Sequence, residues 1–411
     1  MPFWRSTVCR ALAAATGATG AEPGPVHLNV SLREPLVPDP TDPAWPDALD
    51  GRAGGHPWVE VDAAAPPGGT GSPLPGVERT LVLVGSTRDP GLGRSAVAWA
   101  AERGHPVVAE PFGEGSVRAA ALPHGPLVLT ATDWLDAHQP ERVVVVGRIT
   151  LSRAVGALLR RPGVRVELVS DGEQWPDPSH VAAAVHRPAV LAVAAPPRTA
   201  DEPGEWARAW QSAGRRVADA VAAQCFSWPT GLAVAQVVAS GLPGDALLVL
   251  GSSNPVRDLD LVATGPVAGE VLANRGLAGI DGVVSTAVGV ALARPGRPAY
   301  AVVGAGEPTP ALTVVVVNDD GGGIFTTLEP GTAERAADFE RVFGTPTGAH
   351  LAELCRAHGI RHTLAADRGA LASALAAPQD GLAVVEVRVD RATHRQAHID
   401  LRAVAAAALT D

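Results

Sequence analysis

The sequence predicts an α/β protein built on doubly wound parallel sheets. Short β-branched runs are apolar at every position rather than at alternate positions, which is typical of strands buried on both faces. Alanine-rich stretches between these runs favour helices. The predicted strands occupy residues 81–84, 143–146, 166–169, 190–193, 247–250, 300–303, 312–317 and 382–387.

The first residues predict a helix over 6–15 and a strand around 25–29, separated by a glycine-rich turn. Arg5 and Arg10 ahead of the Ala/Thr/Gly stretch at 11–21 resemble a signal peptide. That stretch is not leucine-rich, so a helix is the better interpretation. No run reaches the roughly 18–20 apolar residues of a membrane span. We therefore expect a cytoplasmic protein without an integral membrane segment.

Proline- and glycine-rich stretches at 37–55, 65–76 and 195–206 predict the domain boundaries. They divide the chain into an initial piece at 1–45, a middle α/β domain at 56–194 and a C-terminal α/β domain at 203–411. The initial piece is too short to hold a core of its own.

The composition excludes several function classes. The 411 residues contain 33 basic residues, and all of them are arginine. The chain therefore has no P-loop lysine and no Schiff-base lysine. A net charge of -10 argues against nucleic-acid binding. Three cysteines, Cys9, Cys225 and Cys355, lie far apart and predict reduced thiols rather than a disulfide framework or a zinc site.

Familiar site motifs are missing or incomplete. Residues 85–93 (GSTRDPGLG) lie between a predicted strand and helix but do not form GxGxxG, so an ordinary turn is favoured over a dinucleotide site and a dehydrogenase. The sequence has no GxSxG nucleophile turn. The twelve histidines include no HExxH and no pair that we assign metal-ligand spacing, so most are expected at the surface or in caps.

The most informative segment is 314–325 (VVVVNDDGGGIF), in which a buried strand leads into Asn318, two aspartates and three glycines. Oxygen ligands at the carboxyl end of a strand suit Mg²⁺. Glycines allow the backbone to approach a phosphate closely. The alternative is an Asx turn in a glycine-rich hairpin.

With its neighbours, this segment resembles the SEPHCHC synthase family of thiamine-diphosphate-dependent enzymes. NDDGGGIF is similar to the second half of the thiamine diphosphate motif. Residues 251–258 (GSSNPVRD) resemble the GNSxxxRD segment, and 273–290 (ANRGLAGIDGVVSTAVGV) resemble the NRGASGIDGxxSTAxGxA block. Residues 24–37 and 343–346 also fit. The resemblance covers essentially the whole chain, more weakly in the middle domain.

The resemblance implies decarboxylation of 2-oxoglutarate and addition of the resulting succinyl-semialdehyde carbanion equivalent to isochorismate, giving SEPHCHC in menaquinone biosynthesis. It implies thiamine diphosphate with Mg²⁺ or Mn²⁺, and a homodimer or higher homo-oligomer. The site residues it implies are Asp319 and Gly321 for the metal; Gly279, Ile280, Gly321, Gly322 and Ile324 for the cofactor; and Arg153, Ser253, Arg257, Arg275, Ile324, Phe325 and Leu328 for the substrates.

Two departures from the family pattern stand out. Only the end of the pyrimidine-binding domain is expected in residues 1–45, and the Glu that activates the cofactor has no candidate. The Gly-Asp that opens the thiamine motif is also missing, because Gly304 is followed by Ala305. The middle and diphosphate-binding domains are expected at 56–194 and 203–411.

The spacing of two predicted strands agrees with an internal deletion. Residues 300–303 and 312–317 look like parallel neighbours. Only seven residues, 305–311, lie between Gly304 and the start of the second of these strands. A parallel crossover needs about a dozen or more. We therefore expect this chain to have impaired activity; the alternative is an inactive binding or scaffold protein of the same fold.

Overall fold

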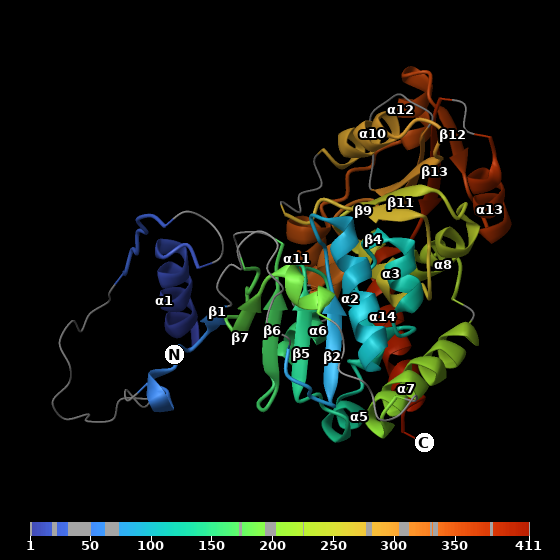
Figure 1. Cartoon of the computed structure of the whole chain (residues 1–411). Coiled ribbons are helices and arrows are strands. Elements are labelled where there is room, and N and C mark those ends of the chain that lie inside the picture. Colours follow the sequence, from blue (N-terminus) through green and yellow to red (C-terminus); the bar gives the residue numbers. More distant parts are fainter. Residues whose placement is uncertain are drawn as a thin grey trace.

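The computed structural model describes residues 2–18, 23–31, 51–61, 74–171, 175–193, 203–224, 226–276, 282–303, 312–328, 331, 336–378 and 381–410. Within these ranges the protein is α/β, with two sheets of largely parallel strands flanked by helices (Figure 1). The α/β class and the parallel sheets predicted from the sequence are confirmed. No helix among the described residues is both long enough and apolar enough to cross a membrane.

The first sheet has six strands in the order β1-β7-β6-β5-β2-β3, and all neighbouring strands are parallel. All five residues of β2 and of β5 are buried, because helices and turns cover both faces. The strands are β1 (Glu60–Val61), β2 (Thr80–Val84), β3 (Val107–Ala109), β5 (Arg142–Val146), β6 (Arg165–Val169) and β7 (Ala182–His186). The helices and helical turns are η1 (Ala53–Gly55), α2 (Pro90–Arg103), α3 (Gly115–Ala120), α4 (Gly125–Val128), α5 (Thr132–Ala137), α6 (Arg153–Leu159) and η2 (Pro188–Ala192).

The second sheet has seven strands in the order β12-β13-β11-β10-β8-β9-β4, and its described pairs are parallel except β4 with β9. The strands are β4 (Gly113–Glu114), β8 (Leu247–Leu250), β9 (Glu270–Leu272), β10 (Ala299–Val303), β11 (Leu312–Asn318), β12 (Arg361–Leu364) and β13 (Leu382–Arg388). The helices and helical turns are α7 (Glu205–Ala222), α8 (Gly231–Gly241), α9 (Asn254–Val262), α10 (Val283–Ala293), η3 (Gly323–Thr327), α11 (Ala336–Phe339), η6 (Glu340–Gly344), α12 (Leu351–Ala357), α13 (Arg368–Ala376) and α14 (Arg391–Ala407).

Two predicted strands are wrong. Residues 190–193 fall largely in the helical turn η2, where Val190 and Leu191 are buried in one core cluster with Trp99 of α2. The apolar run there reflects burial rather than strand pairing. Residues 25–29 have no strand partner in the described structure and are exposed. The predicted N-terminal helix is confirmed as α1 (Pro2–Ala15).

The predicted parallel pairing of the strands at 300–303 and 312–317 is confirmed. β10 and β11 are parallel neighbours, with Ala299 opposite Leu312 and Val303 opposite Val316. Residues 304–311, where we predicted the shortened connection and Ala305, lie outside the described residues.

The two sheets are tied together across the predicted domain boundary. β4, inside the segment expected to form the middle domain, adds to the second sheet beside β9. Trp206 and Trp210 of α7 both donate their indole N–H to the carbonyl of His138, at 3.0 and 3.1 Å. The division at 1–45, 56–194 and 203–411 stays a prediction.

The parallel topology determines where polar loops gather. Since neighbouring strands run in the same direction, the segments that follow β8, β9 and β11 leave from one edge of the second sheet. The segments after β2, β3, β5 and β6 likewise share one edge of the first sheet. Ligand sites in such sheets lie at these carboxyl ends.

Candidate functional site

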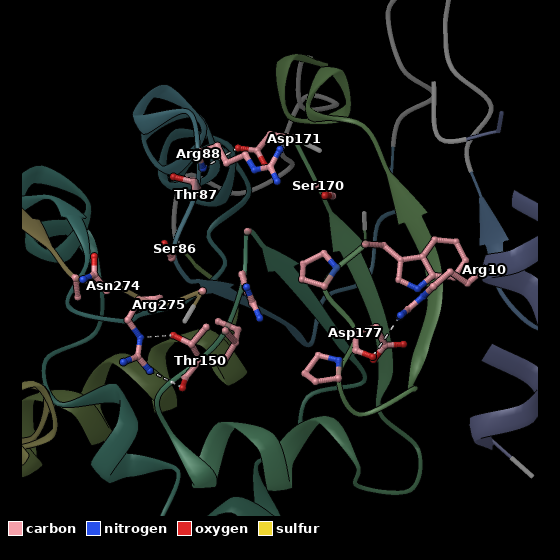
Figure 2. Close-up of a pocket in the computed structure, with 18 of the residues that line it drawn as sticks. Arg10, Ser86, Thr87, Arg88, Thr150, Ser170, Asp171, Asp177, Asn274 and Arg275 are labelled. Atoms are coloured by element: carbon pink, nitrogen blue, oxygen red, sulfur yellow. Dashed lines mark hydrogen bonds between the residues drawn. The ribbon is translucent and has the colours of Figure 1, made fainter. Parts of the chain in front are cut away.

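A cavity of about 1160 Å³ lies where the carboxyl ends of the two sheets meet. One side is formed by loops of the first sheet, which contribute Ser86, Arg148 and Thr150, and the other by Asn274 and Arg275 after β9. Figure 2 shows Arg275 and Arg10 on opposite sides of this space, each with a hydrogen bond to a neighbouring loop.

Arg275 is held in one orientation but keeps a free donor. Its Nε donates to the Thr150 hydroxyl at 2.9 Å, and its Nη2 donates to the Thr150 carbonyl at 2.8 Å. Its Nη1 is buried and has no hydrogen-bond partner among the described residues. An oriented guanidinium that lines the cavity is suited to bind a carboxylate ligand.

Glu110 supports the same loop from the other side. It follows β3, is 5 % exposed and accepts hydrogen bonds from the backbone N–H groups of Thr150 and Leu151, at 2.9 and 2.6 Å. Burial raises the pKa of Glu110 to about 7, although the hydrogen bonds from Thr150 and Leu151 lower this pKa. Thr150 is therefore fixed between a buried carboxyl group and Arg275.

The predicted substrate arginines lie in one electrostatic neighbourhood. Burial lowers the pKa of Arg257, and the positive charges of Arg275 and Arg153 lower it further. Arg257 donates from Nη1 to the carbonyls of Ser252 and Ser253, at 3.1 and 2.5 Å, near the start of α9. Clustered guanidinium groups raise the local positive potential and favour an anionic ligand.

Arg153 occupies the edge of this cluster. It is exposed at the start of α6 and lines a second cavity of about 180 Å³, which shares Thr150 with the larger one. Burial lowers the pKa of Arg402 on α14, and the charges of Arg153 and Arg395 add to this effect. The positive region thus extends from the first sheet to α14.

The loop at 318–323 follows β11 and makes a tight turn. The Asn318 side chain donates to Glu386 at 2.8 Å and accepts from the backbone N–H of Asp320 at 3.0 Å. The Asp320 carboxylate accepts hydrogen bonds from Thr347 and Gly348 and so anchors the segment after η6. An Asx turn is therefore present, but it leads into the helical turn η3 rather than the hairpin of the alternative interpretation, and Asp319 is left as the acidic group facing the glycines.

The three glycines are required by close packing. A Cβ on Gly323 would lie 1.9 Å from Oδ2 of Asp319. A Cβ on Gly321 or Gly322 would lie within about 2.0 Å of the carbonyl oxygens of Gly344 and Phe343, respectively. Burial raises the pKa of Asp319. A cation close to this carboxylate would offset the free-energy cost of burying its charge. The carboxylate oxygens of Asp319 therefore fit a hard divalent metal.

Two arginines of α14 hold the loop and the apolar turn after it. Arg391 donates to the carbonyls of Asp319 and Asp320, at 2.6 and 2.9 Å, and forms an ion pair with Glu340. Arg395 donates to the carbonyls of Thr326 and Leu328, at 3.0 and 2.8 Å. The backbone that carries Asp319 and the turn at 324–328 is therefore fixed by a single helix.

The predicted site residues are only partly brought together. Arg153, Arg257 and Arg275 share one positive region, and Ser253 lies beside Arg257. Ile324 and Phe325 lie in the half-buried turn η3, and the half-buried Leu328 follows it directly. Gly279 and Ile280 lie outside the described residues.

Sequence reasoning missed Glu110, Thr150, Arg391 and Arg395. Glu110 has a usable signal, because it directly follows the short apolar run of β3. The expectation that no histidines have metal-ligand spacing is wrong, since His394 and His398 are four residues apart on α14 and both are buried.

No general protein-family model matches the chain. Three curated relatives carry the same name, 2-succinyl-5-enolpyruvyl-6-hydroxy-3-cyclohexene-1-carboxylate (SEPHCHC) synthase. The protein of Saccharopolyspora erythraea is 43 % identical over 99 % of this chain and 73 % of its own length. Those of Nocardia farcinica and Kineococcus radiotolerans are each 41 % identical over 97 % and 94 % of this chain, and over 71 % and 70 % of their own lengths. The chain therefore belongs to the SEPHCHC synthase family.

Proposed function

We propose that this chain catalyses the reaction of its family, in which 2-oxoglutarate is decarboxylated and the remaining succinyl unit is added to isochorismate, within menaquinone biosynthesis. One observation carries the proposal. Arg275 lines the large cavity and keeps a buried Nη1 that has no hydrogen-bond partner among the described residues, and Arg257 and Arg153 add positive charge nearby. Both substrates are carboxylic acids, and arginine binds carboxylates without titrating.

We propose that the loop at 318–323 holds the diphosphate end of thiamine diphosphate through Mg²⁺ or Mn²⁺. Asp319 and the carbonyl of Gly321 would bind the metal, and the backbone of Gly322 would lie against the cofactor. Bound thiamine diphosphate supplies the electron sink for decarboxylation. The buried carboxylate of Asp319 supports this assignment, because a divalent cation would offset the cost of burying its charge.

The remaining proposed roles belong to binding and orientation. Arg275, Arg257 and Ser253 would fix the substrate carboxylates, with Arg153 at the outer edge of the positive region. Ile324, Phe325 and Leu328 would form an apolar wall that limits water. The resemblance also supports cofactor contacts by Gly279 and Ile280. It likewise supports the division into thiamine-enzyme domains and a homodimer or higher homo-oligomer.

Cofactor binding and turnover test the proposal separately. We expect calorimetry of the purified chain to show thiamine diphosphate binding that needs Mg²⁺. We expect slow release of CO₂ from 2-oxoglutarate, because Ala305 stands where the family motif has a second metal carboxylate. Rapid turnover would contradict the expected impairment. A chain with no magnesium-dependent binding would instead be a scaffold of the same fold.

Replacing Arg275 by alanine is expected to weaken 2-oxoglutarate binding on the order of 10–100-fold, since a charge-assisted hydrogen bond is worth about 1.5–3 kcal/mol. Lysine should recover only part of the affinity, because it cannot keep two donors on Thr150 and offer a third in the same plane. Titration calorimetry with 2-oxoglutarate measures both variants.

The matched control is Arg341→Ala, which removes an arginine that is 77 % exposed and pairs with the equally exposed Asp338. It should leave the affinity unchanged. If Arg275→Ala binds 2-oxoglutarate as tightly as the unmodified chain does, the cavity is not the carboxylate site.

A further inference from the structure

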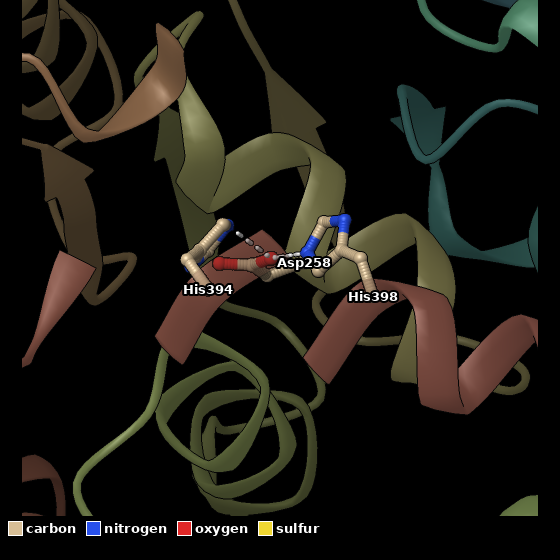
Figure 3. A group of neighbouring side chains, drawn as sticks. All are labelled: Asp258, His394 and His398. Atoms are coloured by element: carbon tan, nitrogen blue, oxygen red, sulfur yellow. Dashed lines mark hydrogen bonds and ion pairs between the residues drawn. The ribbon is translucent and has the colours of Figure 1, made fainter. Parts of the chain in front are cut away.

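A buried cluster of two histidines and an aspartate lies away from the large cavity. Asp258 belongs to α9, whereas His394 and His398 project from successive turns of α14 (Figure 3). Their side chains are 2, 8 and 5 % exposed, respectively. The Asp258 Oδ1 atom lies 2.6 Å from Nε2 of His398 and 3.5 Å from Nε2 of His394. Three possible metal-ligand atoms therefore converge in the protein interior.

One buried nitrogen of this cluster has no hydrogen-bond partner among the described residues. His394 is more than nine-tenths buried, and its Nε2 points towards Asp258 but has no hydrogen-bond partner among the described residues. Buried polar atoms of native proteins nearly always have a partner. A buried carboxylate also needs a counter-charge, which a divalent cation would supply.

The start of α8 packs directly against the carboxylate. A Cβ on Gly231, at the start of α8, would lie 2.2 Å from Oδ2 of Asp258 and 3.1 Å from the ring of His394. Gly231 and Asp258 also line a small cavity of about 10 Å³, which is close to the minimum that holds one water. A water there, or the second carboxylate oxygen, can serve as a fourth ligand.

We propose that Asp258, His394 and His398 bind a Zn²⁺ ion through one carboxylate oxygen and the two Nε2 atoms. Tetrahedral zinc with bonds of about 2.0–2.2 Å places its ligand atoms roughly 3.3 Å apart. The 3.5 Å separation of His394 from Asp258 is close to this value, and the 2.6 Å contact of His398 would open by about 0.7 Å when coordination replaces the hydrogen bond. Imidazole ligands favour zinc over the Mg²⁺ proposed for the loop at 318–323.

Zinc at this position would link the two helices that support the candidate site. Asp258 directly follows Arg257, and the two histidines lie on the helix whose Arg391 and Arg395 hold the loop and the apolar turn. The site would be structural, since the large cavity does not include its ligands.

The test is the zinc content of the full chain, produced in zinc-supplemented medium and purified without chelator in excess Mg²⁺. We expect about one zinc per chain by elemental analysis. After replacement by Co²⁺, the intense visible absorption of four-coordinate cobalt should appear. His394→Gln should lose most of the metal and the absorption; its Nε2 forms no hydrogen bond among the described residues, so the variant is expected to fold.

The matched control is His358→Gln, which replaces an exposed histidine that follows α12. It should retain the metal. A chain with less than about a tenth of an equivalent of zinc and no cobalt absorption would overturn the proposal and leave a hydrogen-bonded cluster. Equal metal in His394→Gln and the unmodified chain would overturn it as well.

Discussion

Gly323→Ala should abolish detectable magnesium-dependent binding of thiamine diphosphate. The added Cβ would lie 1.9 Å from Oδ2 of Asp319, much closer than any non-bonded contact allows. Either the carboxylate rotates away or the turn η3 moves, and both changes remove the proposed metal ligand from its place. Titration calorimetry with the cofactor and Mg²⁺ measures the loss.

Gly289→Ala is the matched control for this substitution. Gly289 lies within α10, and a Cβ there meets nothing within 4 Å, so alanine should leave binding intact and favour the helix slightly. Circular dichroism of both variants checks that they fold. Unchanged cofactor affinity in a folded Gly323→Ala protein would show that Asp319 does not anchor the metal.

Glu110→Gln should remove a pH-dependent loss of stability. The pKa of Glu110 is about 7 in the folded protein and near 4.5 when the chain is unfolded. Between these values the unfolded chain has released the proton and the folded chain retains it, so the free energy of unfolding falls as pH rises. The fall amounts to about 3 kcal/mol at most and is complete above about pH 7.

Glutamine keeps an oxygen acceptor for the N–H groups of Thr150 and Leu151 and never ionises. Urea unfolding at several pH values between 5 and 8 should therefore give a flatter profile for the variant. In the folded protein two neighbouring charges also affect the pKa of Glu110. Asp260 raises this pKa, and Arg275 lowers it. Glu102→Gln, at a residue whose side chain is 57 % exposed, is the control. Identical slopes for Glu110→Gln and the unmodified chain would contradict the prediction.

The sequence predicted most of the central strands but missed β3 and β7, although most of their residues are buried. β5 and β11 are apolar along nearly their whole length, and the structure buries them completely or nearly so. The same rule failed at Val190, because an apolar run reports burial and not the geometry of the backbone. It also missed β12, an edge strand whose residues are mostly polar and exposed.

For the candidate site, the loops could be predicted from the sequence, but most side-chain contacts between them could not. The segments around Ser253 and Asp319 follow predicted apolar strands, whereas the segment around Arg275 was found from the resemblance of residues 273–290 to a family motif. Arg391 gave no such signal, since its partners lie 71 and 72 residues earlier and the pairing depends on how α14 packs. His394 and His398 could have been found from their four-residue spacing, but Asp258 joins them only in three dimensions.

The sequence position of α14 has a consequence for biosynthesis. The loop at 318–323 is translated well before Arg391 and Arg395, so its backbone carbonyls have no partners on this helix while the chain is still being made. A nascent chain that stops short of residue 391 could form β11 but could not fix Asp319 in place. Ribosome-bound intermediates should therefore gain protease resistance around residues 318–328 only after α14 has emerged from the exit tunnel.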